Sequence, residues 1–123
     1  MTARTILSIG GGDRAAFLEN LVSNTVPEPG MGLRYAALLT PQGKLIGDFL
    51  LLAEPDRILL DADARIAPTL FQRLSMYKLR ADVVIEEAAV KVQCGTGAPP
   101  AGALPDPRHP ALGWRLYGDA EGD

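Results

Sequence analysis

The chain has 123 residues, enough for one domain with a modest hydrophobic core. Its 12 Lys and Arg against 15 Asp and Glu give a formal charge of −3, which argues against nucleic acid as the main partner. The single cysteine excludes an internal disulfide, and together with the single histidine it is too little for a common zinc site. The sequence also lacks a membrane-spanning apolar run and a signal-peptide core, so a reducing, cytoplasmic setting is the simplest expectation.

The first part of the chain predicts a strand followed by a helix. Residues 4–9 are short and β-like, and three consecutive glycines end this strand. Asp13 is a plausible N-cap, and apolar residues recur at helical spacing after it, which predicts a helix over 14–22. The glycines lack the spacing of a phosphate-binding loop, so they indicate a flexible strand-to-helix turn.

The next segment predicts a β-hairpin that contains one unusual carboxylate. Residues 33–40 and 44–53 are strand-like, and Thr40-Pro41-Gln42-Gly43 between them is typical of a tight turn. The second strand is almost wholly apolar apart from Asp48. An ionised carboxylate is costly to bury without a partner. Asp48 is therefore either satisfied by its neighbours or kept for a ligand.

The rest of the chain predicts one more helix and several strands. We expect a strand over 57–61, a helix that begins near Ile66 with Pro68 in its first turn, and strands over 79–86 and 90–94. Residues 95–110 contain five prolines and three glycines and predict a long loop.

The order β-α-β-β-β-α-β-β predicts an α+β fold, with two helices packed on one face of a mainly antiparallel sheet. In this interpretation residues 1–94 form the domain, 95–110 are a Pro/Gly-rich loop, and 111–123 start a further strand. An apolar strand so close to the last residue suggests a portion of a longer protein. Its exposed apolar face is a candidate for self-association.

Five blocks of sequence stand out together, at residues 13–24, 35–44, 47–50, 59–61 and 74–83. The most specific are Leu-Leu-Thr-Pro-Gln-Gly-Lys, ending at 44, and Met-Tyr-Lys-Leu-Arg, ending at 80. In order and spacing these blocks resemble the YgfZ branch of the folate-binding, glycine cleavage T-protein-like superfamily. That branch is also marked by Lys-Gly-Cys-x-x-Gly-Gln-Glu, which this sequence lacks, since Cys94 stands in Val-Gln-Cys-Gly-Thr-Gly.

The resemblance implies the N-terminal folate-binding part of a T-protein-like fold. It implies a tetrahydrofolate-binding protein that supports iron–sulfur cluster assembly or repair and affects tRNA modification, without demonstrated turnover. The partners would be folate and iron–sulfur assembly proteins or client enzymes, with no direct nucleic acid and no membrane. One alternative is a T-protein-type aminomethyltransferase that uses tetrahydrofolate, and another is an interaction domain that kept the fold without the ligand.

The resemblance also implies a cofactor site, although no catalytic residue and no metal ligand. Asp48 stands where the family has a carboxylate that approaches the pterin, and Tyr35 matches an aromatic lining residue. Three further residues fall on strands that line the family's central cavity, namely Leu50, Leu59 and Asp61.

Arg80 has two interpretations. It could pair with a carboxylate such as Asp61 or Asp82, which is the simpler one. It could also meet the anionic glutamate tail of folate, because a guanidinium fork suits a carboxylate.

Overall fold

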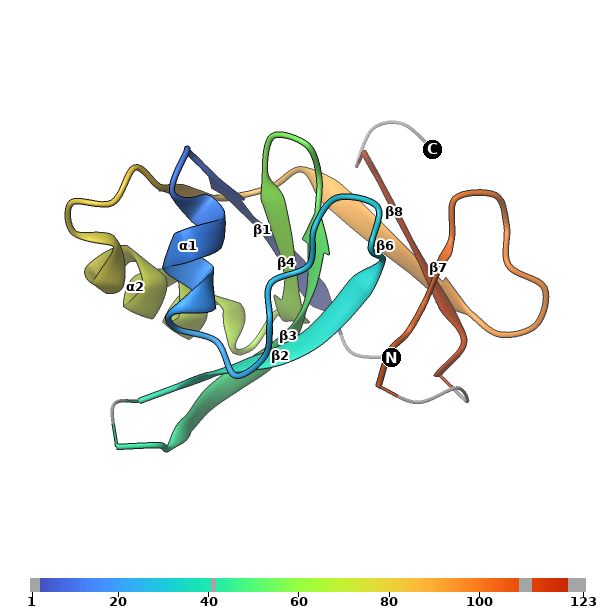
Figure 1. Ribbon diagram of the computed structural model, residues 1–123. Helices are drawn as coiled ribbons and strands as arrows, with labels where there is room; N and C mark the ends of the chain where they lie inside the picture. The colour runs from blue at the N-terminus through green and yellow to red at the C-terminus, as the bar shows by residue number, and fades with distance from the viewer. Residues whose placement is uncertain (1–2, 41, 109–111, 120–123) are drawn as a thin grey trace.

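A five-stranded antiparallel sheet forms the centre of the computed structural model, which describes residues 3–40, 42–108 and 112–119 (Figure 1). Its strands lie in the order β2-β3-β4-β1-β5, with the bounds β1 Arg4–Gly10, β2 Leu33–Leu39, β3 Leu45–Ala53, β4 Ile58–Asp63 and β5 Val84–Glu87. The predicted hairpin is the β2–β3 pair, and the predicted α+β class is confirmed. Pro41 and His109 lie outside the described residues.

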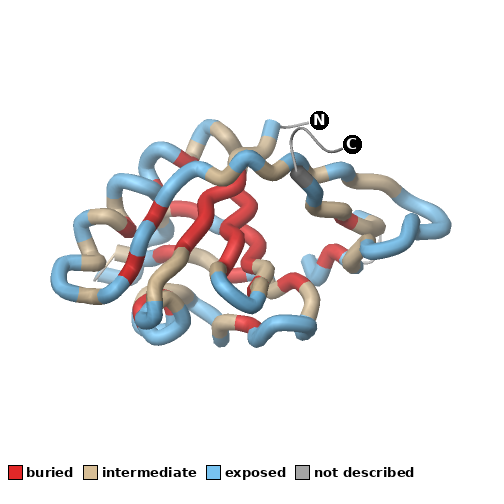
Figure 2. The backbone as a smooth tube through the Cα atoms, turned by 90° about the horizontal axis from the view of Figure 1, so that it is seen from above, coloured by how far each residue is buried: buried red, intermediate tan, exposed pale blue. Residues whose placement is uncertain are grey.

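Two helices cover one face of this sheet, α1 at Arg14–Glu19 and α2 at Ala67–Lys78 (Figure 1). Alternate strand residues point toward them, because successive side chains of a strand face opposite sides. Figure 2 shows that the buried stretches concentrate in the central strands. The resulting core includes Leu7, Ile9, Leu18, Leu38, Phe49, Leu51, Leu60, Leu70 and Leu74.

The helices begin as predicted, and one ends earlier. Pro68 lies in the first turn of α2, where its missing amide donor is not needed. Helix α1 ends at Glu19. The chain beyond it forms an isolated antiparallel bridge between Val22 and Leu38 of β2, which a continued helix could not make. No helix in the described part of the chain is long and apolar enough to cross a bilayer.

The segment after α2 differs from the prediction. A strand was expected over 79–86, but the chain first makes a turn in which the Ala81 amide donates to the carbonyl of Lys78 and the Val83 amide to that of Ala81. Strand pairing therefore begins only at Val84. Arg80 lies in this exposed turn at the end of α2, not in a strand.

A second sheet lies on the opposite side of the five-stranded sheet from the helices (Figure 1). Its order is β6-β8-β7, with β6 at Val90–Gly95, β7 at Leu104–Pro105 and β8 at Trp114–Asp119. The short strand β7 lies within the segment predicted as a loop. Because β8 pairs with both neighbours, it is the central strand of this sheet. Leu112 is exposed and Trp114 and Leu116 are half-buried, so self-association through this apolar face stays a prediction.

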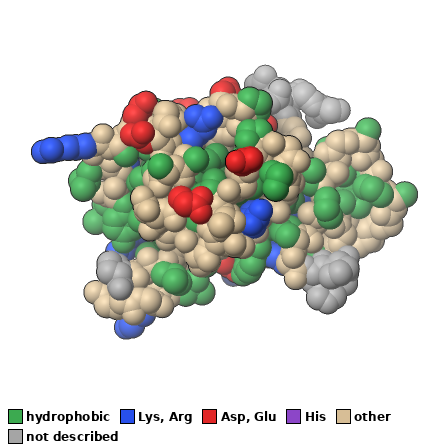
Figure 3. Space-filling model, viewed as in Figure 1, with side chains coloured by type: hydrophobic (Ala, Val, Ile, Leu, Met, Phe, Trp, Pro, Cys, Tyr) green, Lys and Arg blue, Asp and Glu red, His purple; other side chains and the backbone are tan. Residues whose placement is uncertain are grey.

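The side of the molecule seen in Figure 3 carries acidic and basic side chains among apolar ones. No broad patch of a single charge is visible on it.

Gly11 joins the first strand to α1 at a point where no side chain fits. Its φ is +98°, and a Cβ there would lie 2.1 Å from the carbonyl oxygen of Asp82. Close by, the Asp82 amide donates to the Asp13 carboxylate, and the Gly12 amide donates to the Asp82 carboxylate. Asp13 therefore stands at the N-cap of α1 but ties it to the turn before β5 instead of capping the helix with its side chain.

Gly11→Ala should destabilise the fold more than Gly30→Ala. Both glycines have positive φ, but a Cβ at Gly30 meets no atom within 4 Å. We expect Gly30→Ala to lower the free energy of unfolding by about 1 kcal/mol, and Gly11→Ala by at least about 1 kcal/mol more. Urea unfolding of the two variants measures the difference, and equal losses would contradict the close backbone approach.

Candidate functional site

Five of the six predicted site residues share the face of the five-stranded sheet that points away from the helices. Tyr35 pairs with Leu50, and Leu50 pairs with Asp61, so these side chains form one row across three strands. Asp48 and Leu59 flank this row two positions along their own strands, on the same face. The sequence therefore identified a coherent surface without showing which part of it is open.

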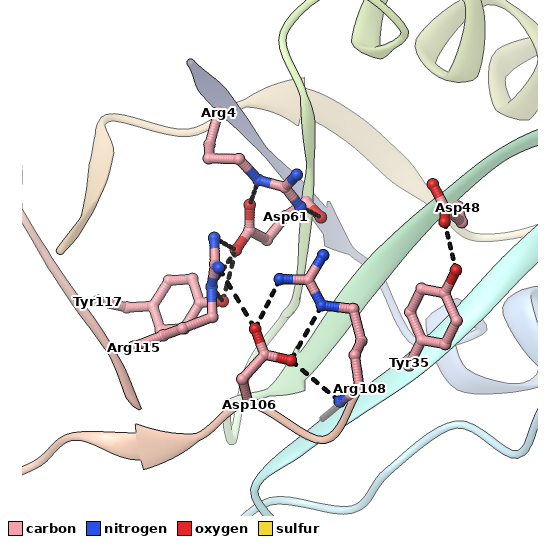
Figure 4. Close-up of polar contacts among 8 residues, drawn as sticks. All are labelled: Arg4, Tyr35, Asp48, Asp61, Asp106, Arg108, Arg115 and Tyr117. Atoms are coloured by element: carbon pink, nitrogen blue, oxygen red, sulfur yellow. Dashed lines mark hydrogen bonds and ion pairs between the residues drawn. The ribbon is translucent and has the colours of Figure 1, made fainter. Parts of the chain in front are cut away.

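The open part is the Tyr35–Asp48 pair. The two residues are diagonal neighbours on β2 and β3, and the Tyr35 hydroxyl donates a hydrogen bond to the Asp48 carboxylate (Figure 4). Both side chains are exposed, Tyr35 to 39%. The hydrogen bond from Tyr35 to Asp48, burial and the charge of Asp48 raise the pKa of the phenol, although Arg108 opposes this. Tyr35 therefore remains a donor at neutral pH and orients the carboxylate.

Asp61 has the opposite environment. It is only 1% exposed, and its neighbours in the row, Ile6 and Leu50, are buried and apolar. Arg4 reaches it from β1, with 2.7 Å between Nε and Oδ1. From β8, the Tyr117 hydroxyl donates to Oδ2 at 2.6 Å and Arg115 Nη2 lies 2.9 Å from the same oxygen (Figure 4). The carboxylate is thus fully engaged and holds the two sheets together.

A second buried carboxylate extends this network. The Asp106 side chain is 1% exposed, and Arg108 binds both of its oxygens, with Nη2 2.6 Å from Oδ2 and Nε 2.9 Å from Oδ1. Arg115 Nη1 lies 3.5 Å from Asp106 Oδ2, so Arg115 bridges the two carboxylates. We call the resulting series the charge chain, defined by Arg4, Asp61, Arg115, Asp106 and Arg108.

The remaining predicted residues have different positions. Leu50 and Leu59 are fully buried on the part of this face that the second sheet covers, and direct contact with a ligand stays a prediction. Arg80 is exposed at the far end of α2 and does not join the row. The sequence analysis missed Arg108, Arg115 and Tyr117, because two lie in or beside the Pro/Gly-rich segment and none belongs to a recognisable motif.

This arrangement favours ligand binding through one open carboxylate. Asp48 can accept hydrogen bonds from a donor-rich ligand, and the Tyr35 ring beside it offers an apolar and aromatic surface. Among the described residues, no group of three or more His, Cys, Asp and Glu side chains is arranged to hold a metal ion.

Asp61→Asn should lower the free energy of unfolding by about 3 kcal/mol, because it leaves the buried Arg115 and the half-buried Arg4 without their shared carboxylate. Asp63→Asn is the matched control on the same strand. Asp63 pairs with an 85% exposed Arg65, and such surface pairs contribute little. Urea unfolding followed by fluorescence of Trp114, the single tryptophan, measures both. If both variants lost a similarly small amount of unfolding free energy, Asp61 would not stabilise the contact between the two sheets.

Acid should weaken the fold partly through Asp106. Burial favours its neutral form, but the hydrogen bonds and charge of Arg108, with the charge of Arg115, outweigh burial and hold the pKa of Asp106 below its usual range. A pKa lower in the folded state gives stability that is full above the unfolded value of about 3.9 and is lost as the pH falls through the folded value. Between about pH 5 and 3, Asp106→Asn should therefore show a shallower loss of stability than the wild type.

Asp56→Asn, an exposed carboxylate in the β3–β4 turn, is the control for this pH dependence. It should keep the slope of the wild type. A slope for Asp106→Asn equal to that of the wild type would contradict the role given to Asp106.

Known proteins resemble this chain both in sequence and in structure. It is 30% identical over 135 residues to the mitochondrial "Iron-sulfur cluster assembly factor IBA57 homolog" of Mycosarcoma maydis, covering 91% of the chain and 34% of that protein. It is 29% identical over 153 residues to the mitochondrial iron–sulfur cluster assembly factor IBA57 of Homo sapiens, covering 99% of the chain and 43% of that protein. The chain thus spans less than half the length of these curated relatives. No family profile matches the chain.

The fold has a counterpart among solved structures. The glycine cleavage system aminomethyltransferase T from Bartonella henselae superposes with a TM-score of 0.64 at 17% identity, over 72% of this chain and 25% of that one. At this identity the likeness shows the fold, which resembles the N-terminal domain of T-protein.

The relatives also correct one expectation. They are mitochondrial proteins, so the expectation of a cytoplasmic setting is wrong. Sequence and fold agree with the resemblance seen in the five sequence blocks. The sequence is similar to those of the IBA57 homologues, and the fold resembles that of the N-terminal domain of glycine cleavage T protein, as the resemblance implied.

Proposed function

We propose that this chain is the tetrahydrofolate-binding part of a protein that supports iron–sulfur cluster assembly. The curated relatives support the assembly role, since each is named as an iron–sulfur cluster assembly factor. Assembly proteins or client enzymes would then be the partners. An effect on tRNA modification would follow indirectly, through modifying enzymes that contain such clusters.

The open face fits a reduced pterin by the chemistry of its donors and acceptors. A pterin ring carries neighbouring N–H and amino groups, and a carboxylate can accept from such a pair. Asp48 offers that acceptor, held in place by the Tyr35 hydroxyl, and the Tyr35 ring offers a surface for stacking. Bound tetrahydrofolate would supply nitrogens that carry one-carbon units, while the side chains of this chain bind and orient it.

The observation that carries the proposal is the contrast between the two carboxylates of one sheet face. Asp61 is buried and fully paired, whereas Asp48 is exposed and has one described hydrogen bond, from Tyr35. A carboxylate in an otherwise apolar strand contributes little to the stability of the fold when it is exposed to solvent. In this proposal residues 1–94 provide the ligand face, and β8 covers the part of it around Asp61 from the same side.

Calorimetry with tetrahydrofolate, kept under argon to prevent oxidation, tests the binding site. We expect Asp48→Asn to weaken binding by about 10-fold or more, because charge-assisted hydrogen bonds contribute about 1.5–3 kcal/mol each. Asp56→Asn, which removes an exposed carboxylate from the β3–β4 turn, should leave the affinity unchanged within about twofold.

Each other outcome identifies a different function. Equal affinity of wild type and Asp48→Asn would remove Asp48 from the site. Absence of heat from the wild type would reject folate binding and favour the interaction domain. Transfer of an aminomethyl group to tetrahydrofolate would favour the aminomethyltransferase instead.

A further inference from the structure

The charge chain ends in a cation on both sides. Its members alternate as Arg4, Asp61, Arg115, Asp106 and Arg108, so three guanidinium groups share two carboxylates (Figure 4). The central Arg115 takes part of the charge of both carboxylates, which leaves each terminal arginine incompletely neutralised. The positive excess therefore falls at the two ends.

The two ends are not equivalent. Arg4 is 18% exposed, and its Nη2 also donates to the main-chain carbonyl of Asp61 at 2.8 Å. Arg108 is 29% exposed, and the one partner it has in the described part of the chain is Asp106, which it binds through its main-chain amide, Nε and Nη2. Among the described residues, Arg108 Nη1 has no hydrogen-bond partner, and Figure 4 shows it directed away from Asp106. Of the two ends, Arg108 is thus the one with a donor nitrogen that no described residue occupies.

Local bonding alone does not explain the position of Arg108. The segment Asp63-Ala64-Arg65 makes the same three contacts two residues apart, with main-chain amide and Nε on Oδ1 and Nη2 on Oδ2. There the carboxylate is 24% exposed and the arginine 85%, so that pair lies at the surface. The pair of Asp106 and Arg108 is held instead against the sheet face by Arg115. The Asp63–Arg65 pair therefore serves as an internal comparison, because it makes the same contacts at an exposed position.

Arg108 faces the open pair on the sheet. Figure 4 shows its side chain between Asp106 and Tyr35. The positive charge of Arg108 acts on the Tyr35 phenol, where it opposes the rise in pKa caused first by the hydrogen bond to Asp48. A negative and a positive group thus stand at the two ends of one short surface.

We infer that Arg108 binds a carboxylate of the ligand whose donor-rich end is held by Asp48. This inference rests on the proposed function and deepens it, because it makes the site selective for molecules with hydrogen-bond donors at one end and a carboxylate at the other. A guanidinium fork with a free nitrogen suits a carboxylate well. Arg80, which the sequence offered for the anionic tail, lies at the far end of α2.

Two ligands of equal size separate the contributions of the two ends. Tetrahydrofolate carries the charged glutamate, and its dimethyl ester keeps the ring system but loses both negative charges. In calorimetry, the wild type should bind the ester about 10-fold more weakly than tetrahydrofolate. Arg108→Gln should weaken tetrahydrofolate binding to the level of the ester and leave ester binding unchanged. Asp48→Asn should weaken both ligands.

Controls exclude a loss of fold. Arg65→Gln removes the matched pair at the surface and should leave both affinities unchanged. Arg108→Lys keeps the charge and should recover part of the preference for tetrahydrofolate. Urea unfolding of each variant shows that the protein measured is folded.

The outcomes distinguish this inference from the function on which it rests. If the wild type binds tetrahydrofolate and the ester equally, the inference is overturned while folate binding stands. The same holds if Arg108→Gln weakens both ligands to the same extent. If the wild type binds neither, the proposed function itself fails.

Discussion

A buried carboxylate shared between two sheets governs this fold. Removing Asp61 from water costs several kcal/mol, and attraction offsets that cost only when partners surround the charge. Arg4 supplies one partner from the same sheet, while Arg115 and Tyr117 supply the others from β8. Satisfying Asp61 therefore requires the second sheet to dock, and docking buries Leu50 and Leu59 beneath it.

The same docking divides one sheet face between structure and ligand. Asp61 lies under the second sheet, and both of its carboxylate oxygens are paired with residues of the two sheets. Asp48, two strands away from Arg4 and diagonal to Tyr35, remains exposed. Two carboxylates that look alike in the sequence thus take opposite roles, because what covers them differs. The proposed folate site concerns the part that stays open.

The sequence predicted what short-range patterns determine. Alternation located the hairpin and β4, and helical spacing located α2 with Pro68 in its first turn. It could not predict the second sheet, because β7 has two residues and its pairing joins distant segments. It offered Asp61 as a residue lining the cavity, and Arg80 either as the partner of a carboxylate or for the tail. No local signal shows that Arg115 reaches Asp61 or that Arg108 reaches the sheet face.

Carboxyl ¹³C chemical shifts of Asp48 and Asp61, followed by NMR while tetrahydrofolate is added, separate the two roles in one titration. The division described above predicts that the Asp48 signal moves with ligand concentration and saturates, whereas the Asp61 signal stays in place. Movement of the Asp61 signal with a fixed Asp48 signal would show that the buried carboxylate is the binding group, and would contradict the division.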